Sequence, residues 1–395
     1  MREFAKRTKN LDISLIRYMR ILAENVPNSI SLGQGIPYFE LYGEIKEKLT
    51  QALKTNKEIN KYTLSKGIFP LREEIAKSIK KEKGAIVKPE REICITSGVI
   101  TGLFCALYAL VDKNDEVILF DPTYEAFIKQ SKLVEGKIRF VPLIEKNGWQ
   151  VDFKKLENAI SKKTKAIIFC NPSNPTGSLL KKEELIEIGK IALKNNLFVL
   201  VDETYDYIVY DNNNYFSLLS LDKLRKILIT FVGFSKRYAL TGFRVGCIIA
   251  REKLLRKIER VFDLISICAP TISQYAALFA LKSNQDFVAK YKKELTENRE
   301  LVCQRLDKLK DLFEYQKPAG SYFIFPKFKL KMKSVEFSKK LLFEAKVVAI
   351  PGITFGPSGE NHIRISFGEK KENIQEAFNR IDNWWKNYKA KNKKL

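Results

Sequence analysis

One stretch of the chain combines a lysine and an arginine at a spacing that suits covalent chemistry. Residues 233–246 read G-F-S-K-R-Y-A-L-T-G-F-R-V-G, with Lys236 just after an apolar run and Arg244 eight residues later. A lysine in a loop at the end of a strand can lose its proton, and its neutral amine then attacks an aldehyde. A nearby arginine can hold a phosphate through two parallel hydrogen bonds. An aldehyde that carries a phosphate describes pyridoxal phosphate, which lysines hold as a Schiff base.

Taken alone, the two residues are better explained as ordinary surface cations in a loop. The elements that must position them therefore matter. Short apolar runs alternate with helical patterns through the middle of the chain, which is typical of a mostly parallel, buried sheet. We expect strands at residues 93–95, 117–120, 138–141, 166–169, 198–201, 227–231 and 245–250.

Several residues with chemical potential follow these strands directly. They are Gly98, Tyr124, Asn174, Asp202 and Lys236. Ligand-binding loops of a parallel sheet lie at the carboxyl ends of its strands. We therefore expect these five residues to meet at one edge of the sheet.

The two ends of the chain have a different pattern of expected helices and strands. Helical spacing covers residues 11–25 and 371–388, and a long charged helix is expected over 287–312. Strands are expected at residues 321–325, 347–350 and 363–367. Because 395 residues exceed what one hydrophobic core comfortably holds, we expect two domains. The predicted large domain is 45–289, and residues 1–44 and 290–395 form a smaller α+β domain.

Composition restricts the chemistry. Hydrophobic residues make up 45% of the chain, no apolar run is long enough to span a membrane, and the N-terminus lacks a signal-peptide core, so we expect a cytoplasmic protein with no membrane partner. None of the six cysteines forms a C-x-x-C pair, which indicates reduced core thiols. His362 is the only histidine, and we expect it to be structural. Sites with several histidine ligands are excluded, and we expect no metal.

The chain is strongly basic, with 70 Lys and Arg against 46 Asp and Glu and a formal charge of +24. This charge favours contact with phosphates and anionic metabolites. The densest runs, at residues 80–83 and 386–394, look like solvated helix ends. No nucleic-acid-binding motif accompanies the charge, so we expect no nucleic-acid partner.

Five motifs stand in a specific order. They are N-P-S-N-P-T-G at 171–177, D-E-T-Y at 202–205, S-K at 235–236, Arg244, and R-I-S-F at 364–367. Together they resemble the class I/II aminotransferases, the aspartate and aromatic aminotransferase-like enzymes of pyridoxal-phosphate fold type I, from about residue 31 to 367. The resemblance implies an α/β fold with a mostly parallel, seven-stranded sheet between helices and a smaller α+β domain. It also favours a reactive Lys236 over a surface cation.

The resemblance assigns roles around the cofactor ring. Lys236 matches the Schiff-base lysine, which also moves a proton between the substrate and the cofactor. Asp202 matches the carboxylate that keeps the pyridine nitrogen protonated. Tyr205 and Asn174 match the pair that binds the phenolic oxygen, and Tyr124 matches the stacking aromatic. Individually, the tyrosines are equally consistent with core packing, Asn174 with a turn cap and Asp202 with a helix cap.

Other roles concern the phosphate. Arg244 matches the phosphate arginine, and Gly98, Val99 and Ile100 match the turn whose N–H groups face it. Tyr62 matches a tyrosine that reaches the phosphate of the neighbouring subunit, which implies a homodimer with shared active sites.

The chain also departs from the family at this end of the site. Gly233 replaces a serine that many members use for the phosphate, and whether Ser235 makes that contact stays open.

The substrate side is less specific. Arg364 matches the arginine that binds the substrate α-carboxylate, with Asn174 and the backbone of Gly35 beside it. The loop after Gly35 is apolar, I-P-Y-F at 36–39, which favours aromatic or aliphatic side chains. No lysine is marked as a second cation for an acidic side chain.

The predicted function is an aminotransferase. It moves the amino group of an L-amino acid, aromatic or aspartate favoured, to 2-oxoglutarate through a pyridoxal phosphate Schiff base and a pyridoxamine phosphate intermediate. One alternative is a lyase or synthase of the same fold, resembling a C–S lyase or an aminocyclopropane carboxylate synthase. Another is a non-catalytic regulator that binds the cofactor, although the first 30 residues are too short for a DNA-binding module and a linker.

Overall fold

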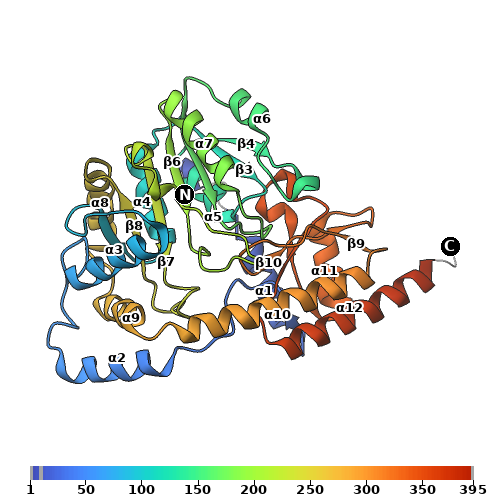
Figure 1. The fold of residues 1–395 in the computed structure, drawn as a ribbon. Helices are drawn as coiled ribbons and strands as arrows, with labels where there is room; N and C mark the ends of the chain where they lie inside the picture. The colour runs from blue at the N-terminus through green and yellow to red at the C-terminus, as the bar shows by residue number, and fades with distance from the viewer. Residues whose placement is uncertain (1–2, 9–11, 393–395) are drawn as a thin grey trace.

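The centre of the molecule is a seven-stranded sheet, seen in a computed structural model that describes residues 3–8 and 12–392 (Figure 1). Its strands are β2 Ile93–Thr96, β3 Glu116–Asp121, β4 Lys137–Pro142, β5 Thr164–Cys170, β6 Phe198–Asp202, β7 Leu228–Gly233 and β8 Gly246–Ala250. The order is β2-β8-β7-β6-β5-β3-β4, and β8 alone runs antiparallel to its neighbours. The seven strands expected for this sheet are confirmed, as is the α/β class.

Helices cover the sheet because its strands are apolar throughout. Every residue of β2, β3 and β8 is buried, so both surfaces of these strands are shielded from water. The helices of this part are α2 Gly43–Thr55, α3 Phe69–Lys83, α4 Val99–Leu110, α5 Glu125–Leu133, α6 Phe153–Asn158, α7 Lys182–Lys194, α8 Glu252–Ser266 and α9 Thr271–Lys282. Helix α4 packs against α5 and α8, whereas α3 and α2 both pack against α9.

The remaining elements gather beside this sheet; those from the end of the chain are orange and red in Figure 1, and α1, from its start, is blue. Their helices are α1 Leu15–Glu24, α10 Asp286–Lys308, α11 Ser334–Ala345 and α12 Lys371–Asn392. Their strands are β1 Ile30–Ser31, β9 Phe313–Glu314, β10 Phe323–Ile324, β11 Lys327–Phe328, β12 Val347–Val348, β13 Ile350–Pro351 and β14 Ile363–Ser366. They form a parallel β1–β12 pair, an antiparallel β10-β14-β13 sheet and an antiparallel β9–β11 pair.

Three of the predicted elements differ from the structure. The strand expected over 321–325 is shorter, because only Phe323 and Ile324 pair with β14. The helix expected over 287–312 ends at Lys308, because Phe313 pairs with Phe328 in the β9–β11 ladder. The strand expected over 347–350 is broken in two, since β12 pairs with β1 and β13 pairs with β14. The predicted domain boundary at residue 290 falls inside α10, and the division into two domains stays a prediction.

The expectation that the lysine run 80–83 is a solvated helix end is wrong for Lys83. Its side chain is only 4% exposed, and Nζ lies 2.6 Å from carboxylates of both Glu203 and Asp206. Burial lowers the pKa of Lys83, but the two carboxylates outweigh that effect and hold the pKa above its usual value. The end of α3 therefore places a charged ammonium beneath the turn that follows β6.

Two other predictions concern single residue types. All six cysteines are buried and free, as predicted. His362 stacks on Phe325, and its Nε2 lies 3.1 Å from Glu145, so it has a packing role. Among helices in the described residues, none combines the length and apolar character needed to cross a bilayer.

Candidate active site

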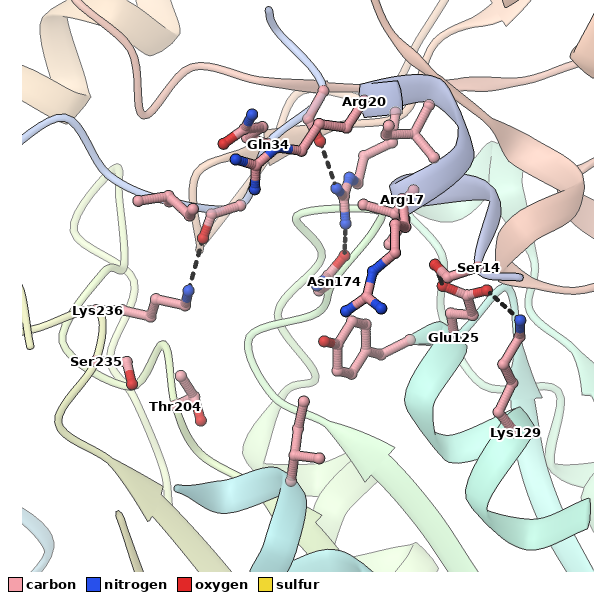
Figure 2. Close-up of a pocket in the computed structure, with 18 of the residues that line it drawn as sticks. Ser14, Arg17, Arg20, Gln34, Glu125, Lys129, Asn174, Thr204, Ser235 and Lys236 are labelled. Carbon is pink, nitrogen blue, oxygen red and sulfur yellow. Dashed lines mark hydrogen bonds and ion pairs between the residues drawn. The ribbon is translucent and has the colours of Figure 1, made fainter. Parts of the chain in front are cut away.

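A cavity of about 1070 Å³ lies at the carboxyl edge of the sheet (Figure 2). All but two of the predicted site residues line it, drawn from the strand ends and from the elements beside the sheet. They are Gly35, Val99, Ile100, Tyr124, Asn174, Asp202, Tyr205, Ser235, Lys236, Arg244 and Arg364. Gly98 adjoins the cavity through Arg244, and Tyr62 is exposed at the surface.

Lys236 projects into this cavity from the turn after β7. Its Nζ donates a hydrogen bond to the Gly35 carbonyl at 2.6 Å, and the Tyr207 hydroxyl donates to the Lys236 carbonyl at 2.7 Å. Burial lowers the pKa of Lys236 to about 8, and the positive charges of Arg244 and Arg364 act in the same direction. A neutral amine is therefore accessible near physiological pH, as a nucleophile requires.

Asp202 ends β6 and is buried. Its Oδ1 accepts hydrogen bonds from the Thr204 N–H at 3.0 Å and the Thr204 hydroxyl at 2.5 Å. Burial raises the pKa of Asp202 to about 6, and the bonds from Thr204 partly oppose the rise. Thr204 thus orients the carboxylate, although the sequence analysis gave it no role within D-E-T-Y.

Two tyrosines supply neutral hydroxyl donors. Tyr205 is buried and packs edge-on against Tyr322 and Phe323, with ring centroids 5.4 and 5.7 Å away. Burial raises the pKa of Tyr205 well above its usual value and that of Tyr124 to about 12. Both phenols stay protonated at neutral pH and can donate to an anionic oxygen.

The turn before α4 forms an anion cradle with Arg244. Gly98 has φ +83°, and a Cβ atom there would lie 2.7 Å from Nη2 of Arg244. Glycine therefore admits the guanidinium to the N-terminus of α4, which begins at Val99. Free N–H groups at a helix N-terminus together with a guanidinium suit a phosphate.

Little space is left for a side chain at Gly233. A Cβ at Gly233 would lie 2.9 Å from the Thr204 hydroxyl and 3.4 Å from the Val99 side chain. Thr204 already occupies the space that a larger residue would need. Ser235 lines the cavity on the same turn.

Arg364 is a buried cation whose hydrogen bonds go to neutral groups. Its Nη1 donates to Asn174 Oδ1 at 2.9 Å and its Nη2 to the Gly33 carbonyl at 2.7 Å. In the described part of the chain, its Nε has no hydrogen-bond partner. The guanidinium lies over the rings of Phe323 and Phe355, at 4.5 and 4.8 Å. A buried cation without a carboxylate indicates a site for an anionic ligand.

Gly35 lines the same cavity as Arg364, but the backbone carbonyl that accepts a hydrogen bond from Arg364 belongs to Gly33. The chain turns between the two glycines, so the Gly35 carbonyl faces Lys236 and the Tyr322 hydroxyl, which donates to it at 2.8 Å.

Comparison with known proteins agrees with this geometry. The family model for aminotransferases of class I and II matches residues 27–381. The chain belongs to this family. It is 36% identical over 379 residues to aromatic-amino-acid aminotransferase 2 of Thermococcus litoralis, covering 95% of this chain and 96% of the relative. It is also 36% identical to a probable aspartate aminotransferase of Methanocaldococcus jannaschii, covering 94% and 97%.

The fold is shared with solved aminotransferases. Thermus thermophilus aspartate aminotransferase with maleate superposes with a TM-score of 0.91 at 26% identity, over 97% of this chain and 100% of that one. The class I and II aminotransferases use pyridoxal phosphate, and the residues of this cavity fit it: a reactive amine on Lys236, a buried carboxylate on Asp202, and the cradle of Gly98 and Arg244.

Sequence analysis missed part of the aminotransferase site. Arg17 and Arg20 of α1 line the cavity. Only the apolar residues of the predicted helix gave a recognisable signal, and nothing in the sequence set the two arginines apart. Of the apolar loop after Gly35, Ile36 lines the cavity, whereas Tyr38 hydrogen-bonds to Glu294 and Phe39 stacks on Tyr291. The loop is therefore less of an aromatic pocket than its sequence suggested.

Proposed function

We propose that this aminotransferase moves the amino group of an L-amino acid, aromatic or aspartate favoured, to 2-oxoglutarate, with pyridoxal phosphate held on Lys236. The observation that carries the proposal is the placement of Lys236, with its lowered pKa, among Asp202, the Arg244 cradle and Arg364. When bound, the cofactor supplies the aldehyde that takes up the amino group and carries it, as pyridoxamine phosphate, to the second substrate.

Lys236 and the side chains around it each have a separate chemical role. Lys236 binds the cofactor and moves a proton at the substrate α-carbon. The Asp202 carboxylate holds a positive charge on the pyridine nitrogen. Tyr205 and Asn174 would donate hydrogen bonds to the phenolic oxygen of the cofactor, and the Tyr124 ring would hold its ring by stacking.

Two arginines handle the anionic groups. Arg244 and the N–H groups at Gly98, Val99 and Ile100 bind the phosphate. Arg364 binds the substrate α-carboxylate, helped by Asn174 and by the loop at Gly35. Borohydride reduction of the holoenzyme and peptide mass spectrometry test the assignment. The pyridoxyl group should be on Lys236, and a label on another lysine contradicts it.

The choice of substrates follows the relatives. Their names specify aromatic amino acids and aspartate, and the Thermus enzyme was solved with maleate, a dicarboxylate. The positive charge of the chain attracts a dianionic acceptor such as 2-oxoglutarate. Single-turnover rates with twenty amino acids test this choice. An exclusive preference for a cationic donor such as lysine or ornithine contradicts it.

A homodimer with shared sites is the proposed assembly. Large apolar side chains are exposed on the loop before α3, on α4 and at the end of α8. They include Tyr62, Leu64, Ile100, Tyr108, Leu264, Ile265 and Ile267. Hydrogen bonds join the segments, from Ser65 to Glu259 and between Ser97 and Ser266. Ile100 also lines the cavity, so the exposed surface continues into the site. Such a patch favours a protein partner.

Complementation tests the shared site. Tyr62 is 79% exposed in one chain, which suits a residue that reaches the phosphate of a second subunit. Mixing a Tyr62→Ala subunit with a Lys236→Ala subunit should restore one working site in each hybrid dimer. Full activity of a monomer at high dilution contradicts the shared site.

A further inference from the structure

Helix α1 presents two arginines to the cavity. Arg17 and Arg20 are three residues apart, so they lie on neighbouring turns of one helix face. Both line the cavity, and Figure 2 shows their guanidinium groups pointing from α1 into it. Arg17 points toward the side of Asn174, and Arg20 points toward Gln34 and Lys236.

The lining of the cavity has more cations than its carboxylates neutralise. The basic side chains are Arg17, Arg20, Lys129, Lys236, Arg244 and Arg364, and the acidic ones are Asp12, Glu24, Glu125 and Asp202. Two of these carboxylates are already engaged. Glu125 lies 3.1 Å from Lys129 and accepts a hydrogen bond from Ser14, and Asp202 accepts from Thr204.

The two arginines of α1 differ in their surroundings. Within residues 3–8 and 12–392, Arg17 forms no hydrogen bond or ion pair with a carboxylate. Arg20 has its Nε 3.9 Å from Glu24, but both side chains are more than 60% exposed. An exposed pair at that distance is weak, so Arg20 stays available to another anion.

Each anionic group of the cofactor and the substrate can be assigned to a cation of the cavity. The proposed function uses Arg244 for the cofactor phosphate and Arg364 for the α-carboxylate. Arg17 and Arg20 are left over in the same cavity, and only a weak, exposed pair with Glu24 engages Arg20. We propose that Arg17, assisted by Arg20, binds the side-chain carboxylate of a dicarboxylic amino acid or 2-oxo acid. The proposal rests on the proposed function and adds the residues that select an acidic substrate.

The helix that carries these arginines is fixed to the rest of the protein. Met19 is fully buried in a core with residues of β12 and β13, on which α1 packs. At the N-terminal end, Ser14 hydrogen-bonds to Glu125, and Lys129 Nζ donates to the Asp12 carbonyl at 2.8 Å. A guanidinium on an anchored helix loses less entropy on binding than one on a loose segment.

Apolar side chains line the cavity together with the two arginines. Ile16 and Ile21 of α1 and Ile36 of the facing loop line the same cavity. They can contact the methylene carbons of a dicarboxylate, and they can equally contact the side chain of an aromatic or aliphatic donor. Neutral substrates therefore bind without the arginines, whereas acidic ones depend on them. This difference makes the proposal testable.

The test compares acidic and neutral substrates in the holoenzyme. Arg17→Gln should lower kcat/KM for 2-oxoglutarate and for aspartate by about 10- to 150-fold, the value of a charge-assisted hydrogen bond. Values for 2-oxohexanoate and phenylalanine should change by less than about threefold. Arg20→Gln should act in the same direction with a smaller loss, and Arg17→Lys should retain part of the activity because it keeps the charge.

A binding measurement separates recognition from catalysis. Calorimetry should show that Arg17→Gln weakens succinate binding about tenfold or more and leaves butanoate unchanged. Arg91→Gln is the matched control, because it removes one exposed arginine outside the cavity lining. Arg91→Gln changes the net charge by the same amount as Arg17→Gln, and it should leave the preference for acidic substrates intact.

Three results would overturn the proposal. Equal losses for acidic and neutral substrates show that the arginines only hold α1 in place. Unchanged kinetics in the Arg17→Gln, Arg20→Gln double variant show that another group binds the carboxylate. A loss of preference in Arg91→Gln shows that only long-range charge matters. Failure of the wild type to transfer any amino group refutes the proposed function instead, and the succinate measurement still decides this inference.

Discussion

Lys236 should titrate about 2.5 pH units below an ordinary lysine. Its pKa is lowered from 10.5 to about 8, first by burial and then by Arg244 and Arg364. At pH 7 a difference of 2.5 units makes the neutral amine roughly 300 times more abundant than on an exposed lysine. The apoenzyme should therefore react with a small amine-reactive ester at Lys236 with a rate that rises through pH 8 and then levels off.

Peptide mass spectrometry over a pH series gives this titration for every lysine in one experiment. Exposed lysines should continue to gain reactivity beyond pH 10 and serve as the internal control. Arg244→Gln should move the Lys236 midpoint upward, since it removes a positive charge. Asp202→Asn should move it downward, since the Asp202 carboxylate favours the ammonium. A wild-type midpoint above pH 10, or no shift in either variant, refutes the electrostatic reasoning.

Three further predictions use other parts of the structure. Lys83→Met should lower the free energy of unfolding by about 3–5 kcal/mol in urea titration, because Glu203 and Asp206 stay buried without their cation. Lys81 is exposed, so Lys81→Met should have little effect. Gly98→Ala should weaken binding of pyridoxal phosphate roughly tenfold or more in an absorbance titration, because the added carbon meets Arg244 at positive φ. Gly84 also has positive φ but has open space around it, so Gly84→Ala should leave cofactor binding unchanged. Arg364→Lys should lower kcat/KM about 10- to 150-fold for acidic and neutral amino acids alike in steady-state assays, and a loss confined to acidic donors contradicts its assignment.

The central sheet and the residues at its edge were predictable from local sequence patterns. Each strand is a short apolar run, and each is followed by a distinctive turn, such as T-S-G before α4 or D-E-T-Y after β6. Parallel strands bring their carboxyl ends together, so residues far apart in sequence could be placed at one edge. Of the five residues expected to meet, all but Gly98 line the cavity.

Contacts between distant segments were not predictable in the same way. The two carboxylates that form ion pairs with Lys83 follow it in the sequence by 120 residues or more. Nothing in K-K-E-K marks that lysine as different from its neighbours. Likewise, Arg17 and Arg20 occupy the polar face of an amphipathic helix, where arginine is common. Only the three-dimensional position of α1 shows that this face lines a cavity.

The split of residues 347–350 has a comparable cause. The run is uniformly apolar, so periodicity predicts one strand. Its first half pairs with β1 and its second half with β14, and this change of partner depends on where those strands lie. The path of the backbone also decides that the Gly33 carbonyl faces Arg364, whereas the Gly35 carbonyl faces Lys236.

Transfer of a ¹⁵N-labelled amino group tests the central claim most directly. Holoenzyme with ¹⁵N-aspartate or ¹⁵N-phenylalanine and unlabelled 2-oxoglutarate should place the label in glutamate, with one keto acid released for each glutamate formed. Lys236→Ala should abolish the transfer. Label that appears as ammonium, or glutamate formation that persists in Lys236→Ala, would contradict an aminotransferase built around Lys236.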